Sequence, residues 1–334
     1  MTQRDKIALI LAGGRIINKA GPDLLETTGL AEEELLAYFQ DKIREKFYTV
    51  SWSYQPVTHY TLRMCGDLIR LAAAQVEAGA SGVVITCGAQ AMAEAAYFAD
   101  LIWTYPQPLV VTSSIYHADM PGSETALHIS QSVRAAESQS CWGQGVLVCV
   151  QDQIYAASEI CQLSSYGRFG YSSFSNGPVA AFTGHSDEIV CFRQVRRGKI
   201  MDIDISPARN VEILDVSLGS GDVLLSALLD GRVSDLDGLV ISAFGDGDVP
   251  PLWGPLLRKI LRAETPVVLA SRCPIGCVRS GIDFEGSAKR LLEMGLISAG
   301  TLTPLQARIR LAVGLGASLK DQELRAYMLD KLCR

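Results

Sequence analysis

Residues 82–98 have the sequence Gly-Val-Val-Ile-Thr-Cys-Gly-Ala-Gln-Ala-Met-Ala-Glu-Ala-Ala-Tyr-Phe. The run Gly82–Thr86 is apolar, short and rich in β-branched residues, which predicts a buried strand. The residues after Gly88 predict an amphipathic helix over Ala91–Trp103. A strand, a glycine-bearing turn and a helix in this order form the unit from which open α/β sheets are built.

The same alternation runs through the rest of the chain. Buried strands are expected at Lys6–Ala12, Gly82–Thr86, Pro108–Thr112, Gly145–Val150, Gly238–Ser242 and Pro266–Ser271. Amphipathic helices are expected at Thr61–Glu77, Ala91–Trp103, Thr125–Glu137, Pro251–Arg262 and Phe284–Met294. The pattern predicts an α/β fold of parallel sheets flanked by helices on both faces, in which ligands bind beyond the carboxyl ends of the strands.

A polar, loop-rich stretch divides the chain of 334 residues. It spans residues 193–210 and contains Arg-Arg-Gly-Lys and Ser-Pro-Ala-Arg-Asn. Strand–helix alternation resumes at Val211. We therefore expect a larger N-terminal α/β domain over residues 1–192, a linker over 193–210 and a smaller C-terminal α/β domain over 211–334.

The composition excludes several classes of partner. A net charge of -6 repels phosphate backbones, so no nucleic acid is expected, and no run of about 18 apolar residues predicts a membrane span. The first residues lead directly into a core strand without a signal-peptide pattern, which favours a cytoplasmic location. Nine cysteines scattered through apolar runs are typical of core thiols in a reducing compartment. Cys273 and Cys277 lack a second ligand pair, so neither a metal nor a cofactor is expected.

Several blocks, in order along nearly the whole chain, resemble the bacterial-type L-asparaginase family. Residues 9–16, Leu-Ile-Leu-Ala-Gly-Gly-Arg-Ile, stand where that family has a strand followed by Thr-Gly-Gly-Thr-Ile. Residues 82–98 parallel a strand, His-Gly-Thr-Asp-Thr-Met and a helix. Residues 238–250, Gly-Leu-Val-Ile-Ser-Ala-Phe-Gly-Asp-Gly-Asp-Val-Pro, and residues 299–308, Ala-Gly-Thr-Leu-Thr-Pro-Leu-Gln-Ala-Arg, are similar to blocks of the second domain.

The resemblance implies a two-domain asparaginase-like fold and a homo-oligomer, a dimer or a tetramer built from close dimers. It further implies that each active site lies between the first domain of one subunit and the second domain of its neighbour. In the family, one threonine attacks the side-chain amide, and a Thr-Asp-Lys relay supplies the base that a hydroxyl nucleophile needs.

The residues that would perform this hydrolysis are replaced. By the resemblance, Arg15 stands in place of the attacking threonine, Ala89 and Gln90 replace the relay threonine and aspartate, and Gln162 replaces the relay lysine. The lid segment, residues 16–37, contains no tyrosine, although the family carries a catalytic one there. We therefore expect no asparagine hydrolysis by the family mechanism. Neutral Gln90 also removes the counter-ion for a substrate α-ammonium group.

Other residues give the altered site a different chemistry. Arg15 is a fixed cation whose planar fork suits a carboxylate or a phosphate. Thr58 aligns with the serine that binds the substrate carboxylate, and His59 beside it is either an acid–base group or a structural or surface histidine. Cys87, near a helix start, is either a reactive thiolate or a small residue packed beneath the site.

Two carboxylates belong to the second domain. Asp283 and Glu285 could face the pocket of a neighbouring subunit and pair with Arg15, or lie in solvent. His117, His128 and His185 have no partner that the sequence identifies, so we expect them to be structural or solvated.

Three hypotheses on function follow. The chain is a repurposed enzyme acting on a small anionic metabolite, in specialised metabolism for example. In the second hypothesis, the chain is a non-catalytic binding or regulatory protein. In the third, it is an amidohydrolase that uses Thr27, Thr28 or Cys87 as its nucleophile. We favour the first, because Arg15 and Gln90 are costly residues for an empty buried pocket.

Overall fold

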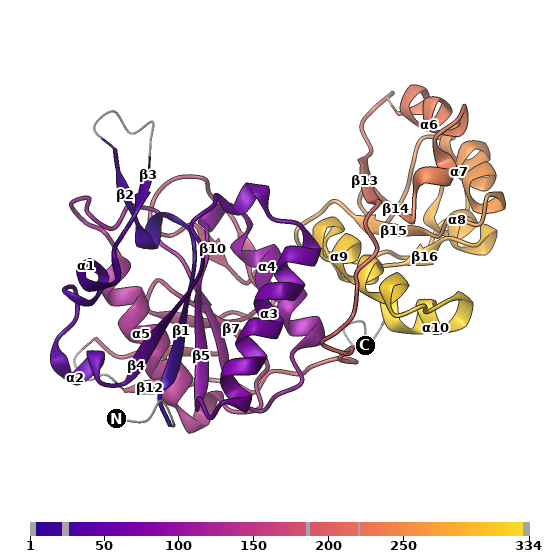
Figure 1. Cartoon of the computed structure of the whole chain (residues 1–334). Coiled ribbons are helices and arrows are strands. Elements are labelled where there is room, and N and C mark those ends of the chain that lie inside the picture. Colours follow the sequence, from indigo (N-terminus) through magenta and orange to yellow (C-terminus); the bar gives the residue numbers. More distant parts are fainter. Residues whose placement is uncertain (1–4, 22–26, 185–187, 220, 330–334) are drawn as a thin grey trace. The chain divides into compact units, whose positions relative to one another are not determined.

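The chain forms two compact units in the computed structural model, which describes residues 5–21, 27–184, 188–219 and 221–329 (Figure 1). The first unit is Met1–Asp204 and the second is Ile205–Arg334. Their division falls within the stretch that the sequence marks as a linker, and residues 193–204 belong with the first unit.

The first unit is built on an eight-stranded sheet with the strand order β12-β11-β8-β7-β6-β5-β1-β4. These strands are β1 (Ile7–Ala12), β4 (Phe47–Ser53), β5 (Gly82–Thr86), β6 (Leu109–Thr112), β7 (Val146–Val150), β8 (Gln153–Ala156), β11 (Ala180–Phe182) and β12 (Ile189–Cys191). The five strands from β7 to β4 are parallel to one another. The predicted parallel character therefore holds for this part, whereas β8, β11 and β12 continue the sheet by antiparallel pairing.

Helices cover both faces of this sheet, with α5 (Thr125–Glu137) on one face and α3 (Leu62–Glu77) and α4 (Met92–Ile102) on the other (Figure 1). Thr61 begins α3 by accepting a hydrogen bond from the Met64 backbone N–H at 3.2 Å. Leu9 and Val84 of the sheet share a buried core with Ile129 of α5. Burial of these apolar faces stabilises the packing of α5 on the sheet.

Short elements lie in the loops between the longer strands and helices. They are the 3₁₀ turns η1 (Arg15–Ile17), η2 (Val57–His59), η3 (Ala89–Ala91) and η4 (Gln139–Cys141), the hairpin of β2 (Asn18–Ala20) and β3 (Thr27–Gly29), the helices α1 (Glu32–Leu36) and α2 (Asp41–Arg44), and the hairpin of β9 (Cys161–Gln162) and β10 (Tyr171–Ser172). The first three turns follow β1, β4 and β5, three adjacent strands of the sheet.

The second unit contains a parallel sheet of β13 (Val211–Asp215), β14 (Gly238–Ala243), β15 (Val267–Ser271) and β16 (Ile297–Ser298). Its helices are α6 (Asp222–Leu229), α7 (Trp253–Arg262), α8 (Ala288–Met294), α9 (Pro304–Gly316) and α10 (Asp321–Met328), with the turn η5 (Val233–Asp235). The sequence prediction started α8 too early, at Phe284. Ser287 caps the helix by accepting from the Arg290 backbone N–H, and Gly286 before it has φ +88°.

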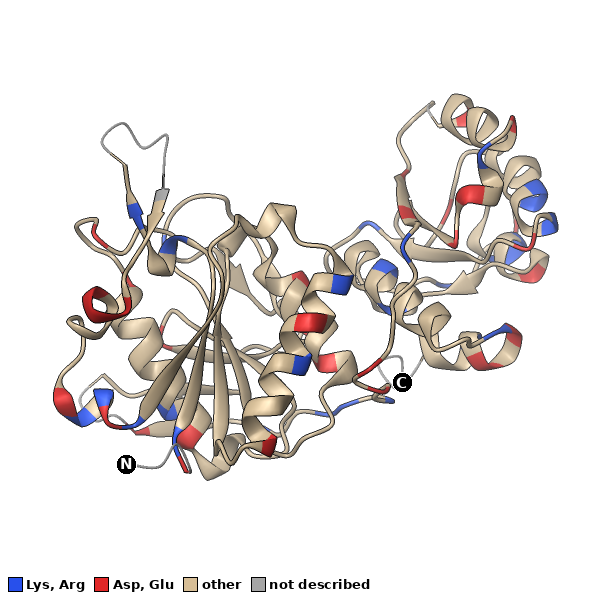
Figure 2. Cartoon of the chain, viewed as in Figure 1, with Lys and Arg blue, Asp and Glu red and all other residues tan. Residues whose placement is uncertain are grey.

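Charged residues of both signs are scattered over the helices and loops of each unit (Figure 2). The central strands β1, β5, β6 and β7 contain none. Among the described residues, no helix has the length and apolar character needed to cross a membrane.

Candidate functional site

The loops after β1, β4 and β5 meet at the carboxyl end of the sheet. Gly14 approaches the β5 loop so closely that a Cβ on it would lie 2.5 Å from the carbonyl oxygen of Cys87. Gly88 packs in the same way on Val57, whose Cγ1 would lie 2.6 Å from an added Cβ. The close approach of the loops thus requires glycine at both positions. The contacts between the loops bring the expected site residues of the first domain together at the carboxyl end of the sheet.

Arg15 follows Gly14 and is exposed at this edge, and Gln90 is exposed too, so the expectation that the two residues lie in a buried pocket is wrong. Its Nη1 donates a hydrogen bond to the carbonyl oxygen of Ile115, in the loop after β6, at 2.9 Å. His117 lies nearby in the same loop. Burial lowers the pKa of His117, and the charge of Arg15 lowers it further. A neutral His117 therefore accompanies the Arg15 cation at neutral pH.

Ala89 and Gln90 lie in η3, beyond the end of β5. The hydroxyl of Tyr171 donates a hydrogen bond to the carbonyl oxygen of Ala89. Tyr171 pairs with Gln162 across the β9–β10 hairpin. The hairpin thus holds Gln162 at the same end of the unit as η3, with its exposed side chain donating to the Ser164 carbonyl oxygen at 3.0 Å.

Thr58 and His59 lie in η2, which packs against η3. Both side chains are exposed, while Val57 of the same turn is buried. The next residue, Tyr60, donates from its hydroxyl to the Ala12 carbonyl oxygen at 2.8 Å, and burial raises its pKa to about 12. A protonated tyrosine thus anchors the η2 loop to the end of β1.

Cys87 is buried beneath the site. Its backbone N–H donates to the Thr112 carbonyl oxygen at 2.9 Å. Burial raises the pKa of the thiol to about 12. The expectation that a nearby helix start lowers this pKa is therefore wrong for Cys87. The environment favours the packing role over the reactive thiolate.

Asp283 and Glu285 are exposed residues of the second unit. The Asp283 carboxylate accepts hydrogen bonds from Arg290 Nε at 2.6 Å and Lys289 Nζ at 3.1 Å. These contacts, led by Arg290, lower the pKa of Asp283. Asp283 is therefore already paired with cations of its own unit.

The described part of the lid segment, residues 16–37, contains the β2–β3 hairpin and α1. Lys19 forms an ion pair with Glu34. Tyr38, just beyond the segment, donates from its hydroxyl to the Ala118 carbonyl oxygen at 3.1 Å. Thr28 is exposed on β3. Residues 22–26 and His185 lie outside the described residues.

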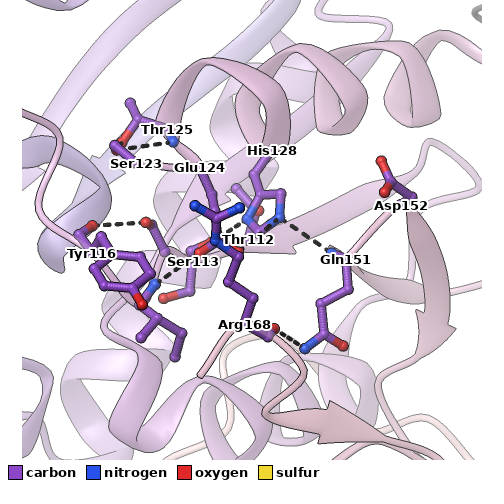
Figure 3. Close-up of polar contacts among 12 residues, drawn as sticks. Thr112, Ser113, Tyr116, Ser123, Glu124, Thr125, His128, Gln151, Asp152 and Arg168 are labelled. Atoms are coloured by element: carbon purple, nitrogen blue, oxygen red, sulfur yellow. Dashed lines mark hydrogen bonds and ion pairs between the residues drawn. The ribbon is translucent and has the colours of Figure 1, made fainter. Parts of the chain in front are cut away.

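The sequence analysis missed a buried polar cluster beside the Arg15 loop (Figure 3). Glu124 is 7% exposed and His128, expected to be structural or solvated, is 3% exposed. The Glu124 carboxylate accepts from the Ile115 backbone N–H at 3.2 Å and lies 4.0 Å from His128 Nε2. The spacing of an acid and a histidine by four residues at a helix start was the signal, because it places both on one helix face.

Comparisons with known proteins agree with this architecture. Residues 6–196 match the family model "Asparaginase, N-terminal" and residues 210–328 match "Glutaminase/Asparaginase C-terminal domain". An L-asparaginase of Bacillus licheniformis is 25% identical, covering 98% of this chain and 99% of its own length. A probable L-asparaginase of Deinococcus radiodurans is 28% identical, covering 95% of both chains.

Two further matches extend the comparison. One component of a glutamyl-tRNA(Gln) amidotransferase of Methanosarcina acetivorans is 27% identical over 79% of this chain and 62% of its own length. The crystal structure of a probable cytoplasmic L-asparaginase from Campylobacter jejuni superimposes with a TM-score of 0.82 over 98% of this chain and 100% of that one. Because the identity is 22%, this last match supports the fold alone.

Proposed function

The chain belongs to the asparaginase family, and we propose that it is a member that does not hydrolyse asparagine by the family mechanism but acts on a small anionic metabolite bound by Arg15. The metabolite carries a carboxylate or a comparable anion. Thr58 or Gln90 assists in its binding. The reaction belongs to specialised metabolism.

The position of Arg15 is the observation that carries this proposal. The side chain is exposed at the carboxyl end of β1, and its one hydrogen bond among the described residues goes to Ile115. A guanidinium group has further N–H donors, arranged as a fork that matches a carboxylate. These donors are available to a ligand at the edge where α/β sheets bind their ligands.

The groups around Arg15 cannot activate a hydroxyl nucleophile in the family's way. Ala89 offers no hydroxyl, and the amides of Gln90 and Gln162 are neutral and not bases. Cys87 does not serve as an alternative nucleophile, because its buried thiol stays protonated at neutral pH. These replacements support a changed reaction over a changed nucleophile.

The proposal includes an assembly and a location. By analogy with the family, the protein forms a dimer or tetramer in the cytoplasm, and Asp283 and Glu285 of one subunit line the neighbour's pocket. His59, exposed in η2, serves as the acid–base group on the solvent side. A non-catalytic binding protein would use the same anchor and differs only in returning its ligand unchanged.

Co-purified metabolites test the proposal. The wild-type protein and Arg15→Ala are purified from the native host, extracted and compared by mass spectrometry, with Arg44→Ala on α2 as the control. We expect a carboxylate-bearing molecule with the wild type and the control, and its loss with Arg15→Ala. The same molecule at equal abundance in all three samples would reject Arg15 as the anchor.

A further inference from the structure

Two free cysteines lie in the loop that follows β15 in the second unit, and the proposed function uses neither of them. Cys273 is exposed and Cys277 is half-buried. The three residues between them are Pro-Ile-Gly. Proline and glycine are residues that tight turns favour, so the sequence between the two cysteines favours a turn that brings them toward each other.

The backbone of this loop folds back onto Cys273. It bends over residues 272–275, and a Cβ added to Gly276 would lie 3.7 Å from Cys273 Cβ. Cys277 follows Gly276 directly, so its side chain starts one residue from the backbone that touches Cys273. A disulfide needs the two Cβ atoms about 4 Å apart, and the conformational freedom of the glycine allows the loop to reach that separation.

Backbone hydrogen bonds fix the loop on both sides. Before it, the Arg272 N–H donates to the Ala243 carbonyl oxygen at 2.9 Å. After it, the Val278 N–H donates to the Gly300 carbonyl oxygen at 3.1 Å. The two cysteines are therefore held in one short segment whose ends stay in place, which makes closure of a ring between them entropically inexpensive.

Arg279 gives Cys277 a cationic neighbour. Its Nε lies 3.4 Å from the Cys277 Sγ, and its backbone N–H donates to the Asp246 carbonyl oxygen at 2.8 Å, which holds the residue beside the loop. The hydrogen bond to Cys277 raises the pKa of Arg279 more than the charge of Asp246 does. Cysteines that react with oxidants lie in partly exposed, electropositive surroundings of this kind.

We propose that Cys277 and Cys273 form a reversible dithiol that responds to hydrogen peroxide. In the first step, the Cys277 thiolate attacks one peroxide oxygen and the O–O bond breaks. The leaving hydroxide takes a proton from solvent, which gives one water and a sulfenic acid on Cys277. In the second step, the Cys273 sulfur attacks the sulfenic sulfur, and the hydroxyl group leaves with the Cys273 proton as a second water.

The two steps balance. One peroxide is reduced to two waters, and two thiols are oxidised to one disulfide, which a dithiol reductant converts back to thiols by exchange. In a reducing compartment, which the composition of the chain favours, such a disulfide is transient and serves to sense oxidants. The inference concerns the second unit alone and does not depend on the proposed role of Arg15.

Peptide mapping of the oxidised wild-type protein tests the proposal. The whole protein is treated with hydrogen peroxide at about pH 7, quenched with an alkylating reagent at increasing times and mapped by mass spectrometry. Cys191 is the internal control, because it is exposed but its Sγ contacts the Arg193 carbonyl oxygen at 3.4 Å instead of a cation. We expect a Cys273–Cys277 disulfide within one chain to form at least about fivefold faster than Cys191 is oxidised, and dithiothreitol to reverse it.

Variants separate the roles of the residues. Cys273→Ser removes the second thiol, so the sulfenic acid should persist on Cys277 and be labelled by dimedone, whereas Cys277→Ser should give no such label at Cys273. Arg279→Gln should slow the oxidation by about threefold, as expected for an exposed charge. Arg258→Gln is the matched control, because Arg258 Nε also contacts a sulfur, that of Met294 at 3.3 Å, and its loss should leave the rate unchanged.

Four results would overturn the inference. They are free thiols at both positions after peroxide treatment, a disulfide from either residue to another cysteine, oxidation of Cys191 as fast as that of the pair, and an unchanged rate in Arg279→Gln. Each of them would leave the Arg15 anchor intact, since Arg15 belongs to the first unit.

Discussion

Gly14 and Cys87 are in direct contact at the carboxyl end of the sheet. A Cβ on Gly14 would lie 2.5 Å from the Cys87 carbonyl oxygen, and the Gly14 backbone has φ +88°. This contact joins the loop that carries Arg15 to the loop that carries Ala89 and Gln90.

Replacement of Gly14 by alanine tests this contact. Gly143 is the matched control, because its φ is +71° but an added Cβ would meet nothing within 4 Å. The positive φ costs each alanine variant about 1–2 kcal/mol of unfolding free energy. Gly14→Ala adds a backbone clash and the strain of a ψ of 161°, which at this φ only glycine adopts readily. We expect a clearly larger loss for Gly14→Ala in urea unfolding. Equal losses would mean that the two loops are not in contact.

The apolar runs predicted the fold well. The six expected strands agree with the structure to within one residue at each end, and α5 agrees at both ends. Strand β4 gave no strong periodic signal, because its composition is mixed and most of its residues are half-buried. The two-residue turn Gln151–Asp152 gave none either. β4 and the antiparallel part of the sheet depend on tertiary pairing and were not foreseen.

The candidate site was predictable only where it follows strands. Arg15, Ala89 and Gln90 come directly after β1 and β5, so strand order alone brings them to one edge. Glu124 was not foreseen, and His128 was expected only to be structural or solvated, because the burial of both depends on how α5 packs on the sheet. The exposure of Asp283 likewise depends on local pairing with Lys289 and Arg290.

The thiol of Cys87 should be unreactive in the folded protein. Burial raises its pKa to about 12, so the thiolate that alkylating reagents attack is scarce at neutral pH and increases only as pH approaches that value. Iodoacetamide at about pH 8 should label the exposed Cys273 and spare Cys87, as read by peptide mass spectrometry. Equal labelling of both at this pH would restore Cys87 as a candidate nucleophile.

Purified protein should release no ammonia from L-asparagine or L-glutamine above background. Arg15, Ala89, Gln90 and Gln162 replace residues that act together, so restoring one of them, as in Ala89→Thr, should not rescue activity. The measurement is a coupled ammonia assay with an active L-asparaginase as the positive control. Turnover within about a hundredfold of that control would contradict the proposed loss of function.

The protein should be a dimer or a tetramer at micromolar concentration, because the proposed pocket takes a wall from a neighbouring subunit. Light scattering coupled to size exclusion gives the mass directly, to be compared with 36.1 kDa for one chain. A monomer would remove the basis for any contribution of Asp283 and Glu285 to the pocket of Arg15.

The affinity of the Arg15 variants for succinate tests the central claim most directly. Arg15→Lys keeps the charge but loses the fork, so binding should weaken by about tenfold, and Arg15→Ala should nearly abolish it. Because the side chain is exposed and makes one hydrogen bond within the described part of the protein, the melting temperature of both variants should stay within about 2 °C of wild type. The opposite result, a lowered melting temperature with unchanged affinity, would show that Arg15 is a structural residue filling a disused pocket.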